Sequence, residues 1–387
     1  MSSPLLQHPI ECCYLHRYVD TFFRVGSTGI NGYRMKMEDK HTVILRDTWS
    51  YISVFDGHYS KHAVNFVSNY FENYVLERNG EIESTDWEKI CEEANKKLKS
   101  SAYLTQNIKS GCVGVWALIK IKDDKYEIQI CNVGDSRGYL VCNGSVIYKT
   151  TDHVPTNEFE KNNILSKGGL IKNGRICADL GGELAVSRSF GDFPFENYVT
   201  TVPSVYKIQI KKDSFHSYYI MLGCDGLFEK TIDINLINII NSLLPHTSIE
   251  QIVHTVCKKA LENGSKDNIT CVLMQLGSKF TKEEHIEFYI GSLLHILKDR
   301  KCREICNSMI RDIFFECEKS PTQSSMDSLI LQKSMSSNFD MDLLQIANVR
   351  LDSILHNSAY EEEIKEINEY LSKYLDDSFS FSSGEDD

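Results

Sequence analysis

The order of strand-like and helix-like stretches is the feature that most constrains the fold of this chain. Runs of alternating or continuous apolar residues, typical of strands, come in groups, and amphipathic helical segments follow each group. Asn143-Gly144 between two such runs is typical of a tight hairpin turn. Hairpins in place of regular crossovers favour an α+β layered sandwich over a doubly wound parallel sheet.

The individual elements follow from the period of the apolar residues. Strands are expected over 33–46, 49–56, 112–121, 126–133, 137–146, 205–210, 218–223 and 269–276. Helices are expected over 60–78, 85–103, 158–167, 233–244 and 248–263. The polar, glycine-rich stretch 152–192 holds one of these helices and is long for a loop, which is typical of a functional or a disordered segment.

Four regions are expected along the chain. They are an N-terminal extension (1–22), a main domain (23–278), a helical C-terminal extension (279–375) and an acidic, serine-rich tail (376–387) that we expect to be disordered. Ile286, Ile290 and Leu293 belong to one apolar stripe of the helical extension. We expect this extension to regulate, localise or stabilise the main domain, and it is a candidate for binding a regulatory partner.

Charge and composition exclude several classes of protein. A formal net charge of -12 argues against binding to nucleic acid, which requires many cations. No apolar run is long enough to span a membrane, and the first residues lack a signal peptide or a myristoylation signal. The thirteen cysteines lack zinc-site spacing and are interpreted as reduced thiols, which favours a cytoplasmic or nuclear protein. A monomer is expected.

Carboxylates lie at the ends of apolar strand-like runs at four separate places, and a fifth, Asp267, comes immediately before the last such run. A single carboxylate at a strand end is usually a turn or cap residue. Several of them at one edge would form an anionic cleft that requires cations, and oxygen ligands favour Mg²⁺ or Mn²⁺ over zinc. Two such ions about 3.5–4 Å apart hold a hydroxide and stabilise displacement at phosphorus, so the pattern predicts phosphoester hydrolysis. The carboxylates are Glu38, Asp39, Asp56, Asp135, Asp225 and Asp267.

Seven motifs then resemble, in order, the signatures of the metal-dependent serine/threonine protein phosphatases of type 2C. The motifs are RMKMEDKH, VFDGH, VGDSRGYL, TTDHVP, LAVSRSFGD, GCDGLFE and SKDNIT. The resemblance covers about residues 23–276. It implies a β-sandwich of two antiparallel sheets flanked by α-helices, and hydrolysis of phosphoserine and phosphothreonine in proteins by a metal-bridging hydroxide.

The resemblance also implies a role for each matching residue. Asp56 would bridge two metal ions, Asp225 and Asp267 would bind one of them, and Glu38 and the Gly57 carbonyl would bind the other. Asp39 would orient water from behind the ligands. Arg34 would hold the phosphate and His58 would act as general acid. For a weaker third metal ion the resemblance points to Asp135 and Glu229, together with Asp225.

Three departures from the family pattern accompany the resemblance. Val113 replaces a threonine near the site, Glu229 replaces an aspartate, and the bulky Tyr59 follows the DGH motif where small residues are usual. Two rival functions remain open at the sequence level. One is a catalytically silent phosphatase-fold scaffold that binds partners. The other is a metal-dependent nuclease, which the acidic charge and the lack of a basic groove disfavour.

Overall fold

The computed structural model describes residues 5–11, 13–177, 182–212, 215–277 and 280–289, together with Cys302 and Lys365. The chain divides into two compact units, a larger one of residues 14–32 and 37–287 and a smaller one of residues 1–13, 33–36 and 288–387. The fold and the site described below belong to the larger unit. Among the described residues, no helix has the length and apolar character needed to cross a bilayer.

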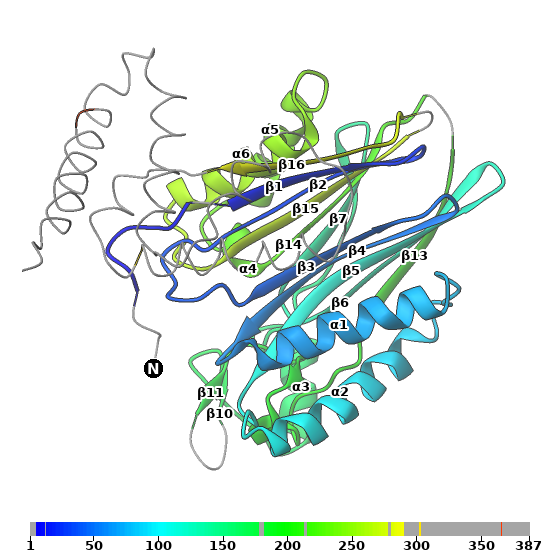
Figure 1. Ribbon diagram of the computed structural model, residues 1–387. Coiled ribbons are helices and arrows are strands. Elements are labelled where there is room, and N and C mark those ends of the chain that lie inside the picture. The colour runs from blue at the N-terminus through cyan, green and yellow to red at the C-terminus, as the bar shows by residue number, and fades with distance from the viewer. Residues whose placement is uncertain are drawn as a thin grey trace, which may run out of the picture. The chain divides into compact units, whose positions relative to one another are not determined.

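Two antiparallel sheets form the centre of the larger unit (Figure 1). The first has the strand order β16 (Glu283–Tyr289), β1 (Cys13–Val19), β2 (Phe23–Ile30), β15 (Ile269–Leu276), β14 (Tyr218–Gly223), β7 (Arg137–Cys142) and β8 (Ser145–Lys149). The second has the order β13 (Ser204–Lys211), β6 (Lys125–Val133), β5 (Gly111–Lys122), β4 (Trp49–His58) and β3 (Asp39–Leu45), and the short β12 (Phe190–Gly191) pairs with β5. The predicted sandwich of two antiparallel sheets is therefore confirmed.

Buried aliphatic side chains fill the space between the two sheets. Val54 and Ile128 from one sheet and Ile220 and Val272 from the other lie in the same apolar cluster and are fully buried. Burial of each such side chain contributes about 1.5–3 kcal/mol. This apolar packing holds the sheets together face to face.

A pair of helices covers the outer face of each sheet (Figure 1). The pair α1 (Lys61–Glu77) and α2 (Trp87–Leu104) covers the second sheet through an aromatic cluster around Phe55, Phe71 and Trp116. The pair α5 (Asp233–Leu243) and α6 (Ile249–Glu262) covers the first sheet. The amphipathic periods in the sequence predicted all four helices, which differ from the expected bounds only at their ends.

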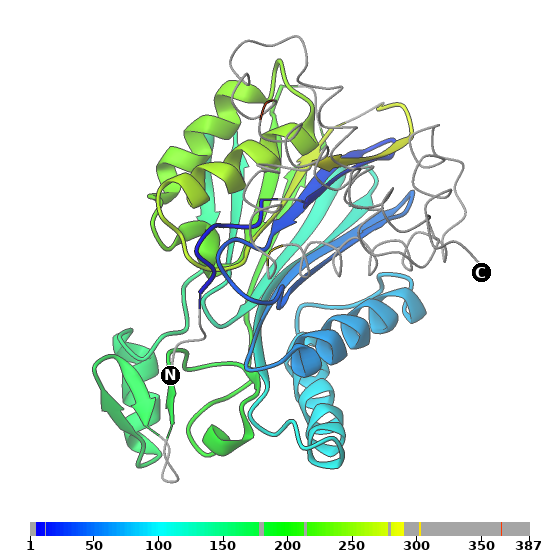
Figure 2. The ribbon, with the colours of Figure 1, turned by 60° about the vertical axis from the view of Figure 1, so that its left-hand side comes forward.

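A smaller layer extends from one end of the sandwich (Figure 2). It consists of α3 (Glu158–Ser166) and a three-stranded sheet in the order β11 (Glu183–Leu184), β10 (Arg175–Cys177) and β9 (Leu170–Lys172). We call α3 and this small sheet the flap. Ile164 and Ile176 of the flap form an apolar cluster with Val113 of β5. The flap thus has a core of its own that is anchored on the central sheet.

Strand β2 was not predicted, because its sequence FRVGSTGI interrupts the apolar alternation with small and polar residues. The glycines have a structural reason. A Cβ atom on Gly26 would lie 2.6 Å from the carbonyl oxygen of Ile249, at the start of α6. The close packing of α6 against β2 therefore requires glycine at this position. The glycine interrupts the apolar alternation by which a strand is recognised in a sequence.

The two chain extensions differ in part from their prediction. Residues 13–19 of the expected N-terminal extension form β1 and pair with β2. Residues 283–289, expected to start a helical extension, form β16 instead. The sequence EEHIEFY of this strand is compatible with an edge position, where charged residues are common. Apart from Cys302 and Lys365, the rest of the predicted helical extension and the acidic tail lie outside the described residues.

Candidate active site at the strand ends

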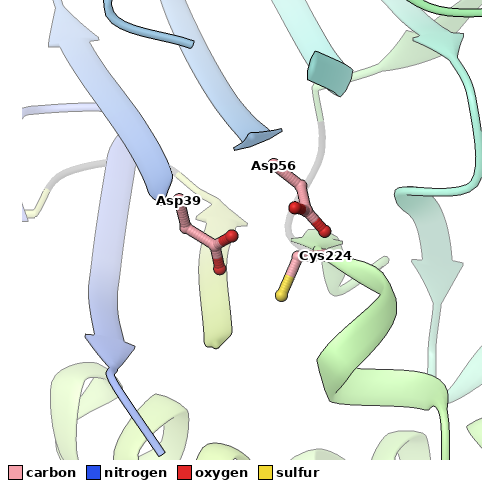
Figure 3. Close-up of side chains that lie close together, drawn as sticks. All are labelled: Asp39, Asp56 and Cys224. Carbon is pink, nitrogen blue, oxygen red and sulfur yellow. The ribbon is translucent and has the colours of Figure 1, made fainter. Parts of the chain in front are cut away.

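Two aspartates lie opposite each other where β3 begins and β4 ends. Asp39 and Asp56 are direct partners in the register of these two strands. Figure 3 shows both carboxylates converging near Cys224, which precedes the short helix α4 (Asp225–Phe228). One ligand atom from each of the three residues lies within 4.8 Å of the others. The Asp39 carboxylate also accepts a hydrogen bond of 2.6 Å from the Thr270 hydroxyl on β15 of the other sheet.

Asp225 and Asp267 come to the same place from the other sheet. Asp225 is the first residue of α4, and Asp267 lies just before β15. The two segments approach closely because Gly226 has no side chain, since a Cβ atom there would lie 2.0 Å from the Asn268 carbonyl oxygen and 3.0 Å from the Asp267 Cβ atom. Both sandwich layers therefore deliver carboxylates to one edge, as the sequence predicted.

The carboxylates raise one another's pKa. Burial, followed by the charges of Asp39 and Asp225, raises the pKa of Asp56 well above its usual value. Burial, followed by the charges of Asp135 and Asp267, does the same to the pKa of Asp225. Burial and the Asp152 charge raise the pKa of Asp135 to about 6. Such mutual repulsion in a buried cluster indicates that the cluster requires neutralisation.

The donor set fits a hard divalent cation. The Oδ1 atom of Asp225 is buried and has no hydrogen-bond partner among the described residues, although a buried carboxylate oxygen is normally satisfied. The Cys224 thiol contacts the backbone in the structure, because its S–H donates to the Asn268 carbonyl at 3.4 Å. Burial and the nearby aspartates raise its pKa well above the usual value, and its sulfur accepts a hydrogen bond of 3.1 Å from the Thr270 N–H. Oxygen atoms without thiolate favour Mg²⁺ or Mn²⁺.

Gly57 and Glu38 are joined through their backbones. The Gly57 N–H donates to the Glu38 carbonyl at 3.1 Å, and the Glu38 N–H donates to Oδ1 of Asn268 at 2.9 Å. A Cβ atom on Gly57 would lie 2.9 Å from the side chain of Val64 in α1. Glycine thus lets the end of β4 pass directly against α1, and the two hydrogen bonds hold the Glu38 backbone beside Gly57 and Asn268.

His58, the last residue of β4, meets a carboxylate that the sequence-based assignment of roles missed. Its Nε2 atom lies 2.8 Å from both Oδ atoms of Asp192. Burial lowers the pKa of His58, but the Asp192 carboxylate opposes this effect and the pKa is raised overall. Asp192 ends the motif LAVSRSFGD, and that position was the available signal for it.

Other motif residues fix the loops around the site. Arg137 donates from Nε to Asp152 at 2.9 Å and from Nη1 to Asp233 at 3.0 Å. His153 lies with Nε2 2.8 Å from the Ser204 hydroxyl, and its Nδ1 accepts from the backbone of the VGDSR turn. These contacts hold the loops with the motifs VGDSR and TTDHVP against each other. Residues of the two motifs therefore have a structural role as well as a chemical one.

A second charged pair ties the flap to the centre of the domain. Arg188 donates from Nε to both carboxylate oxygens of Glu160 in α3, at 3.1 Å each. The Glu160 carboxylate also accepts from Ser187 at 2.8 Å. Both members of the pair are largely buried, so the pair fixes the start of α3 against the segment that leads to Asp192.

The roles of two further predicted residues, Arg34 and Glu229, stay predictions from the sequence. Arg34 belongs to the smaller unit, so its assignment rests on the sequence motif. Glu229 is exposed at the end of α4, and its carboxylate pairs with Lys230 at 3.0 Å.

Two departures from the expected pattern have structural explanations. Val113 is buried in the apolar cluster of the flap, where a methyl group packs in place of a hydroxyl. Tyr59 has a φ of 67°, a left-handed conformation that glycine adopts without steric cost.

Comparisons with known proteins agree with the motifs. A family model described as protein phosphatase 2C matches residues 23–269. Protein phosphatase 1B of Rattus norvegicus is 28% identical over 284 residues, covering 65% of this chain and 70% of the relative. Protein phosphatase 1A of Bos taurus is 26% identical over 303 residues, covering 70% of this chain and 76% of the relative.

Solved structures share the fold. A phosphatase from Toxoplasma gondii superposes with a TM-score of 0.61 at 18% identity, covering 72% of this chain and 99% of that structure. A sex determining protein of C. elegans superposes with a TM-score of 0.55 at 22% identity, covering 65% and 64% of the two chains. At these identities the likeness concerns the architecture alone.

Proposed function

Because the chain belongs to the protein phosphatase 2C family, and is therefore a metal-dependent serine/threonine protein phosphatase, we propose that the carboxylates at the strand ends form its metal centre. The single observation that carries this proposal is the buried Oδ1 atom of Asp225, which has no hydrogen-bond partner among the described residues and lies among aspartates of raised pKa. A divalent cation satisfies such an atom and removes the repulsion.

In this proposal Asp56 would contribute to the binding of two Mg²⁺ or Mn²⁺ ions. Asp225 and Asp267 would hold one ion with it, and Glu38 and the Gly57 carbonyl would hold the other. Asp39 lies opposite Asp56 and is fixed by the Thr270 hydroxyl, so it orients groups within the cluster. When bound, the ions would supply a hydroxide nucleophile and neutralise the charge of the phosphate.

The chain's own residues then position the substrate and move the proton. His58 donates a proton to the serine or threonine oxygen as its bond to phosphorus breaks, a role supported by its place beside Gly57 and by a side chain that is 29% exposed. Arg34 holds the phosphate oxygens through its planar fork of donors. Asp135 and Glu229, with Asp225, would hold a third ion, and we expect it to bind weakly because the Glu229 carboxylate already pairs with Lys230.

The substrates in this proposal are phosphoproteins, and the enzyme works as a monomer in the cytoplasm or nucleus. The alternative of a silent scaffold is not favoured. A scaffold has no need for five mutually repelling aspartates in one cluster, because the cluster costs stability without a cation.

The proposed centre is tested with the full chain and defined metal content. We expect hydrolysis of p-nitrophenyl phosphate and of phosphoserine or phosphothreonine peptides with Mn²⁺ or Mg²⁺, and none after EDTA treatment. Asp56→Asn should lower activity by at least about 100-fold, because the ligand shared by both ions is weakened. Full activity of this variant would refute the shared-ligand assignment. Titration calorimetry with Mn²⁺ should show weaker binding in the variant, and an unchanged circular dichroism spectrum should show that the variant is folded.

A further inference from the structure

His58 and Asp192 are brought together across a glycine. His58 pairs with Gly111 in the register of β4 and β5, and Gly191 pairs with the same Gly111 in the register of β12 and β5. A Cβ atom on Gly111 would lie 2.4 Å from Nε2 of His58 and 2.2 Å from Oδ2 of Asp192. The two side chains therefore occupy the space that any other residue at position 111 would fill.

Asp192 is fixed from several sides. Its N–H donates to the Ser110 carbonyl at 3.2 Å, and its Oδ2 accepts from the Ser189 hydroxyl at 2.6 Å. The preceding N–H, of Gly191, donates to Oδ1 of Asn95 in α2 at 2.8 Å. Asp192 itself has a left-handed backbone with a φ of 48°. A residue held in an unfavourable conformation by this many contacts is often part of a functional site.

The two partners differ in their access to solvent. The Asp192 side chain is 1% exposed, whereas that of His58 is 29% exposed. The imidazole can therefore reach a substrate, and the carboxylate can act only through the imidazole. This is the geometry of a carboxylate that orients a histidine and sets which ring nitrogen holds a proton.

We propose that Asp192 is a positioning residue for phosphate ester hydrolysis: it accepts the Nε2 proton of His58 in a hydrogen bond and so directs Nδ1 to the leaving oxygen. This inference rests on the proposed role of His58 as general acid. As the phosphorus bond to the serine or threonine oxygen breaks, the Nδ1 proton passes to that oxygen. The Nε2 proton stays in its hydrogen bond to Asp192, and His58 ends as the neutral imidazole.

Leaving groups of different basicity provide the test. p-Nitrophenolate departs without a proton, whereas a serine or threonine alkoxide requires one. With the full chain and saturating Mn²⁺, His58→Ala and Asp192→Asn should each lower kcat on a phosphothreonine peptide by about 10- to 100-fold. Each should lower kcat on p-nitrophenyl phosphate by less than about threefold, because general acid catalysis contributes little there. KM should change little on either substrate.

A matched control and a double variant complete the test. Glu160→Gln removes another buried carboxylate of the same region, the partner of Arg188, and should affect both substrates alike. The double variant His58→Ala/Asp192→Asn should be no slower on the peptide than His58→Ala alone, because both changes remove one function. Ser189→Ala, which removes a single hydrogen bond to Asp192, should show the same selectivity on a smaller scale.

The outcomes test the general-acid role of His58 and the positioning role of Asp192 separately. If His58→Ala is selective for the peptide but Asp192→Asn slows both substrates equally, the positioning role is wrong and the general acid stands. If His58→Ala itself is unselective, the general acid is wrong, and the role of Asp192 is overturned with it. Additive losses in the double variant also contradict the positioning role.

Discussion

Asp39 and Asp56 face each other across neighbouring strands at the edge of the sandwich. Like charges placed directly opposite on paired strands destabilise a sheet, and here burial strengthens the effect. Without cations, the repulsion between these two carboxylates therefore lowers the folding stability of the protein.

Asp56→Asn should therefore stabilise the protein when metal is removed. We expect the free energy of unfolding in EDTA to rise by about 1 kcal/mol, because one of the opposed charges is lost. With saturating Mn²⁺ the order should reverse, since the wild type gains more from metal binding. Urea unfolding followed by circular dichroism, with and without Mn²⁺, measures both effects. A variant less stable than the wild type in EDTA would contradict the repulsion.

His16 and His41 should make the protein sensitive to acid. Their rings lie 6.4 Å apart between centroids, and burial lowers the pKa of each to about 4. A histidine whose pKa is lowered in the folded state stabilises the fold only while neutral. Its contribution is therefore lost as pH falls from about 6.5 towards 4.

We expect His41→Asn to reduce the loss of Tm over this pH range. The control His216→Asn, at an exposed position, should follow the wild type. Thermal unfolding at half-unit steps of pH measures the difference. Identical slopes for His41→Asn and the wild type would show that His41 does not couple folding to protonation.

Tyr59 carries backbone strain that glycine would relieve. With a φ of 67°, Tyr59→Gly should be more stable than Tyr59→Ala by about 1 kcal/mol, because glycine adopts this conformation without steric cost. At Tyr103, an exposed position in α2, the glycine variant should instead be less stable than the alanine variant by about 1 kcal/mol. Chemical denaturation of the four variants gives both differences. Alanine as the more stable residue at position 59 would exclude strain.

Val113 should resist replacement by the threonine that is usual in the family. Its side chain is 3% exposed within the apolar cluster of the flap, so Val113→Thr buries a hydroxyl and should cost about 1–2 kcal/mol. Val205→Thr, at a position that is 37% exposed, should be nearly neutral. Equilibrium unfolding compares the two. Equal stability of Val113→Thr and the wild type would place the side chain outside the cluster.

The sequence predicted the parts of the fold whose side chains follow a simple period. Strands β14 and β15 and helices α1, α5 and α6 agree with expectation, and the Asn143-Gly144 turn adopts positive φ at both residues. It did not predict β2, because Gly26 serves the packing of α6 and breaks the apolar pattern. It also misassigned β16, because an edge strand with many charges resembles the start of an exposed helix.

The candidate site was predictable where its residues occur in short motifs. Asp39, Asp56, Asp225 and Asp267 each end or begin an apolar run, and the fold brings them to one edge. The contact of His58 with Asp192 joins residues 134 positions apart, and no local sequence pattern predicts it. Cys224 was missed for a different reason, because its place beside the aspartates depends on the register of β14 and β15.

The absence of a side chain at Gly111 has a consequence for how such proteins diverge. One methyl group at this position would fill the space in which the imidazole meets the Asp192 carboxylate, and it lies outside the proposed metal ligands. On the role proposed for Asp192, the altered protein would hydrolyse phosphothreonine peptides more slowly, while its hydrolysis of p-nitrophenyl phosphate would change little. A single change of glycine to alanine would therefore alter which substrates are hydrolysed without altering any proposed metal ligand.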